Sequence, residues 1–176
     1  MDQTGKMNSS SDTVRVAIYG AGNFANRTHI PNLKNIEGVE IVAVSDINEE
    51  SRKNTASQFD IPNAYADAHE MLAKEEFDAL YSIVPAFART DVETAAAGKG
   101  IHIFSEKPQA IQMETARRIN QAIEDAGVIS TVGYRERYRP FFQEAKRILS
   151  DKKLVHVRFQ SFRGLPARAG EAAEKK

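Results

Sequence analysis

Residues 14–28, VRVAIYGAGNFANRT, decide how the rest of the chain is interpreted. The apolar run from Val14 to Tyr19 predicts a buried strand, and the residues after the glycines favour a helix. Gly20 permits a tight turn, and Gly22 has no Cβ to hold an anion away from the backbone. The small Ala25 lets the helix pack closely on the strand. We therefore predict a site for the pyrophosphate of a dinucleotide, formed by Gly20, Gly22, Asn23, Phe24 and Ala25.

A carboxylate follows the second apolar run, Val39 to Val44, at the position where a dinucleotide site needs one. Asp46 comes 46 − 20 = 26 positions after Gly20, near the roughly 20-residue spacing of a ribose-binding acid. It would accept hydrogen bonds from the ribose hydroxyls and repel a 2′-phosphate, so NAD is expected and NADP is less favoured. The alternative is that Asp46 only caps or flanks the next helix.

The composition gives no reason to expect nucleic acid, a membrane or a metal ion as a partner. The chain has 176 residues, with 24 basic and 24 acidic side chains and no cysteine. The balanced charge gives no electrostatic case for nucleic acid or an acidic membrane, and cysteine-ligated metal and disulfides are excluded. The polar N-terminal stretch lacks the apolar core of a signal peptide, and no run reaches the roughly 18 apolar residues of a membrane span. We expect a cytoplasmic protein with no metal site.

The rest of the chain alternates strand and helix patterns. Strands are expected at 39–44, 64–65, 78–84, 101–104, 128–132 and 154–159, and helices at 23–34, 48–59, 67–74, 90–97, 113–126 and 140–149. This alternation predicts an α/β fold with a doubly wound, Rossmann-like parallel sheet. We expect a disordered tail at 1–13, a dinucleotide-binding domain at 14–153, the start of a second domain at 154–163 and a polar tail at 164–176.

Further motifs follow in one order: the GxGxxA turn, Asp46, Ala97-Gly98-Lys99, Glu106-Lys107-Pro108 and Gly133-Tyr134. Together they resemble the N-terminal domain of the Gfo/Idh/MocA oxidoreductases, the glucose–fructose oxidoreductase and inositol dehydrogenase group. The resemblance covers residues 14–162. It implies that a larger α/β domain with an open antiparallel sheet would follow and would form much of the substrate pocket and the oligomer interface. That second domain is largely absent from this sequence, which stops soon after residues 154–159.

The resemblance also implies roles for individual residues. Lys107 would be catalytic, beside the reacting oxygen, and would also be cofactor-binding if it helps to hold the nicotinamide side of the cleft. The alternative is a surface lysine before a turn. Glu106 would contact the nicotinamide ribose or orient Lys107, and Pro85 would touch the cofactor through backbone groups. Tyr134 and Arg137 would line the substrate side, although a packing aromatic and an ion-paired arginine fit them equally well. A cis Lys107–Pro108 bond is compatible with the sequence.

Two departures from the family pattern introduce arginines. Arg89 stands where a histidine near the cofactor is common, and Arg135 stands where an asparagine is common. Either both face the cleft, which would suit an anionic substrate, or both are solvated surface arginines. None of the four histidines can be matched to the family's catalytic position.

Two functions remain open at this point. The first is a nicotinamide-dependent oxidoreductase of the sugar or polyol dehydrogenase type, represented by its cofactor-binding domain. The alternative is a non-catalytic NAD-binding module with a sensing, regulatory or assembly role, so whether the chain is itself an enzyme stays undecided. The exposed edge at 154–159 is expected to pair with a second copy, to pair with another chain, or to be disordered.

Overall fold

The structure is a computed structural model that describes residues 13–89 and 91–160. It contains two compact units, divided along the chain between Tyr134 and Arg135, and each is described by itself below. The strands are β1 (Val14–Tyr19), β2 (Val39–Ser45), β3 (Asn63–Tyr65), β4 (Ala79–Ser82), β5 (His102–Ser105) and β6 (Ser130–Val132). The α-helices are α1 (Ile30–Lys34), α2 (Glu49–Phe59), α3 (Ala68–Lys74), α4 (Val92–Gly98), α5 (Met113–Ala126) and α6 (Pro140–Leu149). A π-helical turn η1 (Ala25–His29) and two 3₁₀ turns, η2 (Ala86–Ala88) and η3 (Arg135–Tyr138), complete the elements.

The six strands form one parallel sheet in the order β3-β2-β1-β4-β5-β6. The order reverses between β1 and β4, the two central strands, so this is a doubly wound sheet with its switch point at their carboxyl ends. The predicted fold class is confirmed. Ligands of such sheets bind in the crevice at that point.

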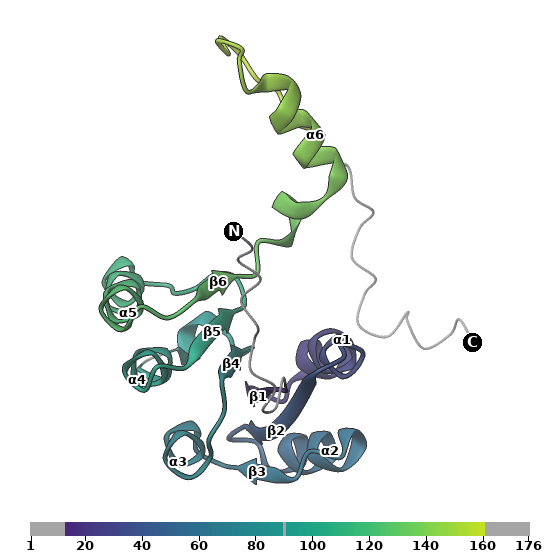
Figure 1. The fold of residues 1–176 in the computed structure, drawn as a ribbon, viewed down its shortest axis with the longest axis vertical. Coiled ribbons are helices and arrows are strands. Elements are labelled where there is room, and N and C mark those ends of the chain that lie inside the picture. The colour runs from purple at the N-terminus through teal and green to yellow at the C-terminus, as the bar shows by residue number, and fades with distance from the viewer. Residues whose placement is uncertain (1–12, 90, 161–176) are drawn as a thin grey trace, which may run out of the picture. The chain divides into compact units, whose positions relative to one another are not determined.

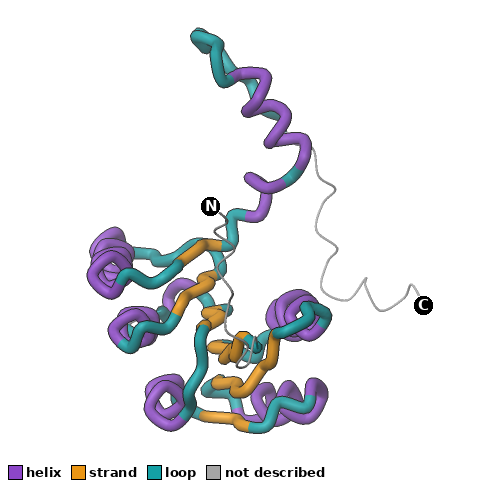
Figure 2. Tube along the Cα trace, in the orientation of Figure 1, coloured by secondary structure: helices purple, strands orange, loops and turns teal. Residues whose placement is uncertain are grey.

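Helices cover both faces of the sheet (Figures 1 and 2). An apolar cluster on one face joins β1 and β2 to α1 and α2, and it includes Val16, Ile18, Ile30, Leu33 and Ile41. A second cluster on the other face joins the same strands to α3, α4 and α5, and it includes Ala17, Val42, Met71, Leu80 and Ala96. Successive residues of β1 alternate between the two clusters because side chains of a strand point to opposite faces.

One irregularity interrupts that alternation in β2. Val16 is opposite Ile41, whereas the next residue, Ala17, is opposite Ala43, so Val42 is an extra residue in the register. Val42 and Ala43 consequently both belong to the cluster on the α3 and α4 face. An extra residue of this kind increases the local twist of the strand.

Helix ends follow the signals predicted from the sequence. The Asn48 side chain accepts a hydrogen bond from the Ser51 N–H at 2.8 Å, and that of Asp67 accepts from the first-turn N–H groups of α3. Gly127 ends α5 with a left-handed φ of +64°. The helix expected over 23–34 forms as η1 followed by α1, with Pro31 in the first turn of α1.

The second unit contains η3, α6 and the residues after α6. The helix expected from Pro140 is confirmed. The strand expected at 154–159 is wrong, because these residues form no strand and are exposed. A strand needs hydrogen bonds from a neighbouring strand, and none of the described residues pairs with this segment. The second unit also contains residues 135–153, which the sequence assigned to the dinucleotide-binding domain.

Some predictions fall on parts of the chain that the structure leaves out. The expected tails at 1–13 and 164–176 lie outside the described residues, apart from Thr13, as do the last three residues of the 154–163 segment. Among the helices of the described ranges, none combines the length and the apolar character that crossing a membrane requires.

Candidate functional site

The turn after β1 has room only for glycine at its first position. Gly20 has a φ of +104°, a value that side-chain-bearing residues rarely adopt. Its N–H donates a hydrogen bond to the Ser45 carbonyl at 2.8 Å. A Cβ at Gly20 would lie 2.9 Å from Val84 Cγ1 and 3.0 Å from the carbonyl carbon of Ile83. The ends of β1 and β2 and the segment after β4 therefore meet at this residue.

The second glycine of the turn faces open space. A Cβ at Gly22 would meet no atom within 4 Å. The Gly22 carbonyl accepts a hydrogen bond from Asn26 N–H at 3.1 Å, at the start of the helical segment. The N–H groups of a first helical turn have no partner within the helix, so this open side suits an anion. Asn23 and Phe24 are exposed beside the turn, whereas Ala25 is fully buried in the cluster that contains β1.

Asp46 connects the end of β2 to this turn. Its Oδ2 accepts a hydrogen bond from Ala21 N–H at 2.8 Å, and its Oδ1 accepts from Asn48 N–H at 2.8 Å. The carboxylate therefore both supports the glycine turn and flanks the start of α2. A carboxylate has about four lone-pair sites, so these two bonds leave acceptor capacity for two ribose hydroxyls.

A cavity of about 150 Å³ lies at the carboxyl ends of β1, β2 and β3. It opens beside Asp46, and the Asp67 carboxylate at its wall also accepts from His69 N–H at 2.7 Å. Nε2 of His69 in turn lies 3.1 Å from Oδ1 of Asp91. The cavity is lined by Tyr19, Ser45, Asp46, Ile47, Ala66, Asp67, Ala68, His69 and Val92.

On the other side of the switch point, Glu106 directly follows β5 and has a buried carboxylate. Its Oε1 lies 3.0 Å from Nε2 of His29, and its Oε2 accepts from Lys107 N–H at 3.1 Å. Gly133 packs against it so closely that a Cβ there would lie 2.9 Å from Oε1. Three segments far apart in the sequence therefore hold this carboxylate in one orientation.

His29 is a residue of this site that the sequence analysis did not select. Its ring packs among Phe24, Tyr81 and Phe104, with ring centroids 5.1, 6.1 and 5.1 Å away. A signal was present in the sequence: His29 follows the buried Ala25 by four residues, and residues at this spacing share one face of a helix. His29 thus lies on the face turned towards β4 and β5.

Lys107 and Pro85 occupy the edges of the same crevice. Lys107 is 59% exposed at its side chain, and its Nζ lies 3.9 Å from Oε2 of Glu106. The peptide bond between Lys107 and Pro108 is cis, as the sequence allowed. Pro85 is exposed directly before η2, three residues after the end of β4, and its carbonyl accepts from Ala88 N–H.

Arg89 differs from both interpretations offered by the sequence, because it is neither in the open cleft nor on the solvated surface. Only 4% of the residue is exposed. Its guanidinium donates to five backbone carbonyls, those of Ser82, Val84, Glu106, Pro108 and Gln109. Its Nε lies 3.7 Å from Oε1 of the fully buried Glu93. A buried cation is stable only with such partners, so these contacts account for the burial of Arg89.

Burial changes the acid–base properties of this region. Burial lowers the pKa of the Arg89 guanidinium, while the neighbouring carboxylates of Glu93 and Glu106 act in the opposite direction. An arginine remains protonated at neutral pH even so. Burial and the charge of Glu93 raise the pKa of Tyr19, whose hydroxyl donates to the Ala88 carbonyl at 3.2 Å.

The residues predicted for the substrate side lie in different units. Tyr134 ends the first unit and is exposed, with its N–H donating to the Val132 carbonyl at 2.6 Å. Arg137 belongs to η3 of the second unit, where its carbonyl accepts from the Gln143 side chain. Arg135 is exposed and its Nε lies 3.4 Å from Oε1 of Glu136, which fits a surface arginine. In residues 13–89 and 91–160, no group of three or more acidic, histidine or cysteine side chains could hold a metal ion.

A parallel sheet with this strand order, a glycine turn at its switch point and a carboxylate after β2 defines a dinucleotide-binding domain. The chain belongs to the Gfo/Idh/MocA family: residues 14–134 match the family described as "Oxidoreductase family, NAD-binding Rossmann fold". The family match ends at the same residue as the first structural unit.

Individual relatives agree with this assignment. The scyllo-inositol 2-dehydrogenase (NAD(+)) of Bacillus subtilis (strain 168) is 30% identical over 135 residues, 76% of this chain and 39% of that protein. The D-apiose dehydrogenase of Paraburkholderia graminis is 31% identical over 153 residues, 85% of this chain and 40% of that protein. The WlbA dehydrogenase of Bordetella pertussis, solved in complex with NADH and UDP-GlcNAcA, superposes with a TM-score of 0.73 at 25% identity, covering 78% and 42% of the two chains. The chain thus spans about two fifths of the length of the curated relatives it matches.

Proposed function

We propose that this chain is the cofactor-binding part of a nicotinamide-dependent dehydrogenase that acts on a sugar or polyol. The observation that carries the proposal is the arrangement at the switch point, where the open Gly22 turn, Asp46 and the Glu106-Lys107 pair all lie at the carboxyl edge of one sheet. Relatives named as inositol and apiose dehydrogenases support the substrate class.

The residues present fit a dinucleotide. The backbone from Gly20 to Ala25, including Asn23 and Phe24, would hold the pyrophosphate, because a Cβ-free turn and a helix start lie side by side there. Asp46 would hold the adenosine ribose with its remaining acceptor sites, next to the cavity of about 150 Å³. Its negative charge would also make NAD preferred over NADP. Pro85 would contact the cofactor through backbone atoms.

The chemistry would take place at the β4 and β5 side of the crevice. When bound there, the nicotinamide supplies hydride transfer. Lys107 would donate a hydrogen bond to the substrate oxygen, and its positive charge would stabilise the alkoxide that develops as the carbinol is oxidised. The hydride would go to the nicotinamide, and the hydroxyl proton would go to a base of the substrate domain that the family resemblance implies. Glu106 would keep Lys107 in place through the contact with its backbone N–H. Tyr134 and Arg137 would contribute to the substrate side.

Several wider predictions belong to the same proposal. They are a cytoplasmic protein with a small-molecule substrate, no nucleic-acid or membrane partner, and a nucleotide-binding domain that extends to residue 153. Leu154, Val155, Val157 and Phe159 are exposed, which supports pairing of the 154–159 segment with a second copy or another chain.

Calorimetric titration with NAD and NADP tests the proposal, carried out on the wild-type chain, on Asp46→Ala and on Lys107→Met. Wild type is expected to bind NAD more tightly than NADP. Asp46→Ala should weaken NAD binding by about 10- to 100-fold, because hydrogen bonds to a charged group contribute about 1.5–3 kcal/mol. Lys107→Met should bind NAD nearly as well as wild type, because its ammonium acts on the substrate. Absence of NAD binding by the folded wild type would contradict the proposal.

Turnover is measured separately, as NAD reduction with a panel of polyols. Activity that is present in wild type and lost in Lys107→Met would support the catalytic role of the lysine. Tight NAD binding without turnover of any polyol would instead favour the non-catalytic NAD-binding module.

A further inference from the structure

The buried arginine at position 89 joins the two loops that face the cofactor crevice. Its Nη1 donates to the carbonyls of Glu106, Pro108 and Gln109, the last two at 2.9 and 3.3 Å. These three carbonyls lie on both sides of Lys107 in the sequence. One planar guanidinium therefore restrains the backbone before and after the proposed catalytic lysine.

The same side chain also restrains the segment after β4. Its Nη2 donates to the Val84 carbonyl at 3.0 Å and lies 3.4 Å from the Ser82 carbonyl. Val84 is the residue whose Cγ1 leaves no room for a Cβ at Gly20. Arg89 is thus linked, through one intervening residue, to the turn that would receive the pyrophosphate.

Glu93 makes it feasible to bury a charge at this place. Its Oε1 lies 3.7 Å from the Arg89 Nε and accepts a hydrogen bond from the Ser82 hydroxyl at 2.5 Å. Taking a guanidinium out of water is costly unless it is paired and hydrogen-bonded. Here the charge of Glu93 offsets part of that cost, and the two Nη groups of Arg89 bind backbone carbonyls.

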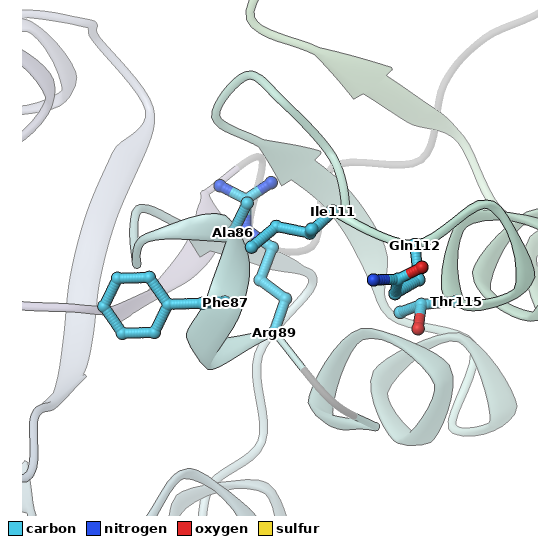
Figure 3. A pocket seen from close by; sticks show the side chains of 6 residues that line it. All are labelled: Ala86, Phe87, Arg89, Ile111, Gln112 and Thr115. Carbon is cyan, nitrogen blue, oxygen red and sulfur yellow. The ribbon is translucent and has the colours of Figure 1, made fainter.

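The segment that follows Pro108 has little support apart from Arg89. A cavity of about 230 Å³ lies beside it, lined by Ala86, Phe87, Arg89, Ile111, Gln112 and Thr115. Figure 3 shows Arg89 and Ile111 next to each other, between the η2 segment and the start of α5, while Phe87 points away. Phe87 and Ile111 are 76% and 62% exposed, so apolar packing does little to hold the segment that follows Pro108.

We propose that Arg89 is a positioning residue that fixes the Lys107 loop and the Val84 segment as one unit, so that both present a preformed wall to the dinucleotide. This inference rests on the proposed function. A lysine at this position would keep the charge opposite Glu93, but its single ammonium could not bridge both loops.

The test compares Arg89→Met and Arg89→Lys with wild type and with Met71→Ala. Met71 is fully buried in α3 and bonded to neither loop, so its truncation lowers stability through a core cavity away from both loops. NAD affinity is measured by calorimetry at a temperature at which circular dichroism shows every variant folded. Hydrogen exchange of peptides covering residues 83–89 and 105–110 is followed without ligand.

Both arginine variants should bind NAD about 10- to 100-fold more weakly and exchange faster in both peptides, whereas Met71→Ala should keep wild-type affinity. If Arg89→Met does not fold, Arg89→Lys decides, because it retains the ion pair. Arg89→Lys with NAD affinity within about twofold of wild type and unchanged exchange would overturn the inference. If wild type itself binds no NAD, the proposed function fails, and the exchange rates alone then decide whether Arg89 fixes the two loops.

Discussion

The two halves of the crevice are built by different means. At the ends of β1 and β2, the site consists of backbone shape: Gly20 with its positive φ, the open Gly22, and the half-buried Asp46. At the ends of β4 and β5, it consists of buried charged side chains, Arg89 and Glu106, each held by several segments.

This difference shows how one sheet edge can serve two tasks. A pyrophosphate needs backbone N–H groups that a ligand can approach closely, and missing side chains provide them. A reacting group needs a fixed orientation, and buried, hydrogen-bonded charged side chains provide it. Such side chains are stable only while all of their hydrogen-bond partners are in place. The first half should therefore be sensitive to added atoms, and the second to lost or displaced partners.

The largest effect is expected for Gly20→Ala, which tests the half built on shape. The new Cβ would meet Val84 and the Ile83 backbone at 2.9 and 3.0 Å, in a conformation that alanine rarely adopts. The free energy of unfolding should fall by about 2–4 kcal/mol in urea denaturation, and NAD binding should be lost. Gly98→Ala is the matched control, since a Cβ there meets no atom within 4 Å at the end of α4. Equal stability of the two variants would contradict the account.

Gly133→Ala tests the half built on charge. The added methyl group would lie 2.9 Å from Oε1 of Glu106 and 3.2 Å from Cζ of Phe104, so one or both side chains must shift, and the contact between Glu106 and His29 should be disturbed. Overpacking of this kind costs about 1–3 kcal/mol, measurable by urea denaturation. A crystal structure of the variant with the contact between Glu106 and His29 intact would show that this carboxylate is not tightly held.

Asn48→Ala should have a smaller effect, confined to the first half. The Asn48 side chain caps α2 through its bond to Ser51 N–H, and loss of such a cap costs about 1 kcal/mol. The backbone N–H of Asn48 would remain to hold Asp46. Thermal unfolding should therefore show a lowered midpoint, while calorimetry shows NAD affinity close to that of wild type. A large loss of affinity would mean that the cap itself positions Asp46.

The smallest effect concerns Tyr65 at the end of β3, and its pH dependence falls in the alkaline range. Its hydroxyl donates to Oε1 of Glu75 at 2.5 Å, and this bond raises the pKa of Tyr65 to about 12. The stabilisation is fully present below the unfolded pKa of about 10 and is lost as pH rises through 12. Unfolding of wild type and Tyr65→Phe between pH 8 and about pH 12 should therefore show the difference between them shrinking as pH rises. A difference in unfolding free energy that stays constant with pH would contradict a stabilising role of this hydrogen bond.

Local patterns explain what the sequence predicted well. The tight turn after β1 and the caps at Asn48 and Asp67 each depend on residues close together in the chain. The alternating elements likewise predicted the doubly wound sheet, because parallel strands require helical crossovers.

Long-range contacts explain what it did not predict. Arg89 is buried because carbonyls up to 20 residues away converge on it, and no spacing of residues in the sequence predicts such a cluster. His29 meets Glu106 across 77 positions of sequence. The alternating pattern at 154–159 predicted a strand that does not form, because no described strand pairs with this segment to supply hydrogen bonds. The sequence pattern therefore predicts the buried faces of helices and strands and the positions of turns. It does not predict the distant residues that pair with a buried charge or with an edge strand.

The central claim is that the glycine turn and Asp46 together receive a dinucleotide. A crystal structure of the chain soaked with NAD tests it directly. The account predicts the diphosphate against the backbone N–H groups around Gly22, and the adenosine ribose within hydrogen-bonding distance of Asp46. NAD bound elsewhere on the surface, with the Gly22 turn untouched and Asp46 contacting only Ala21 and Asn48, would contradict it.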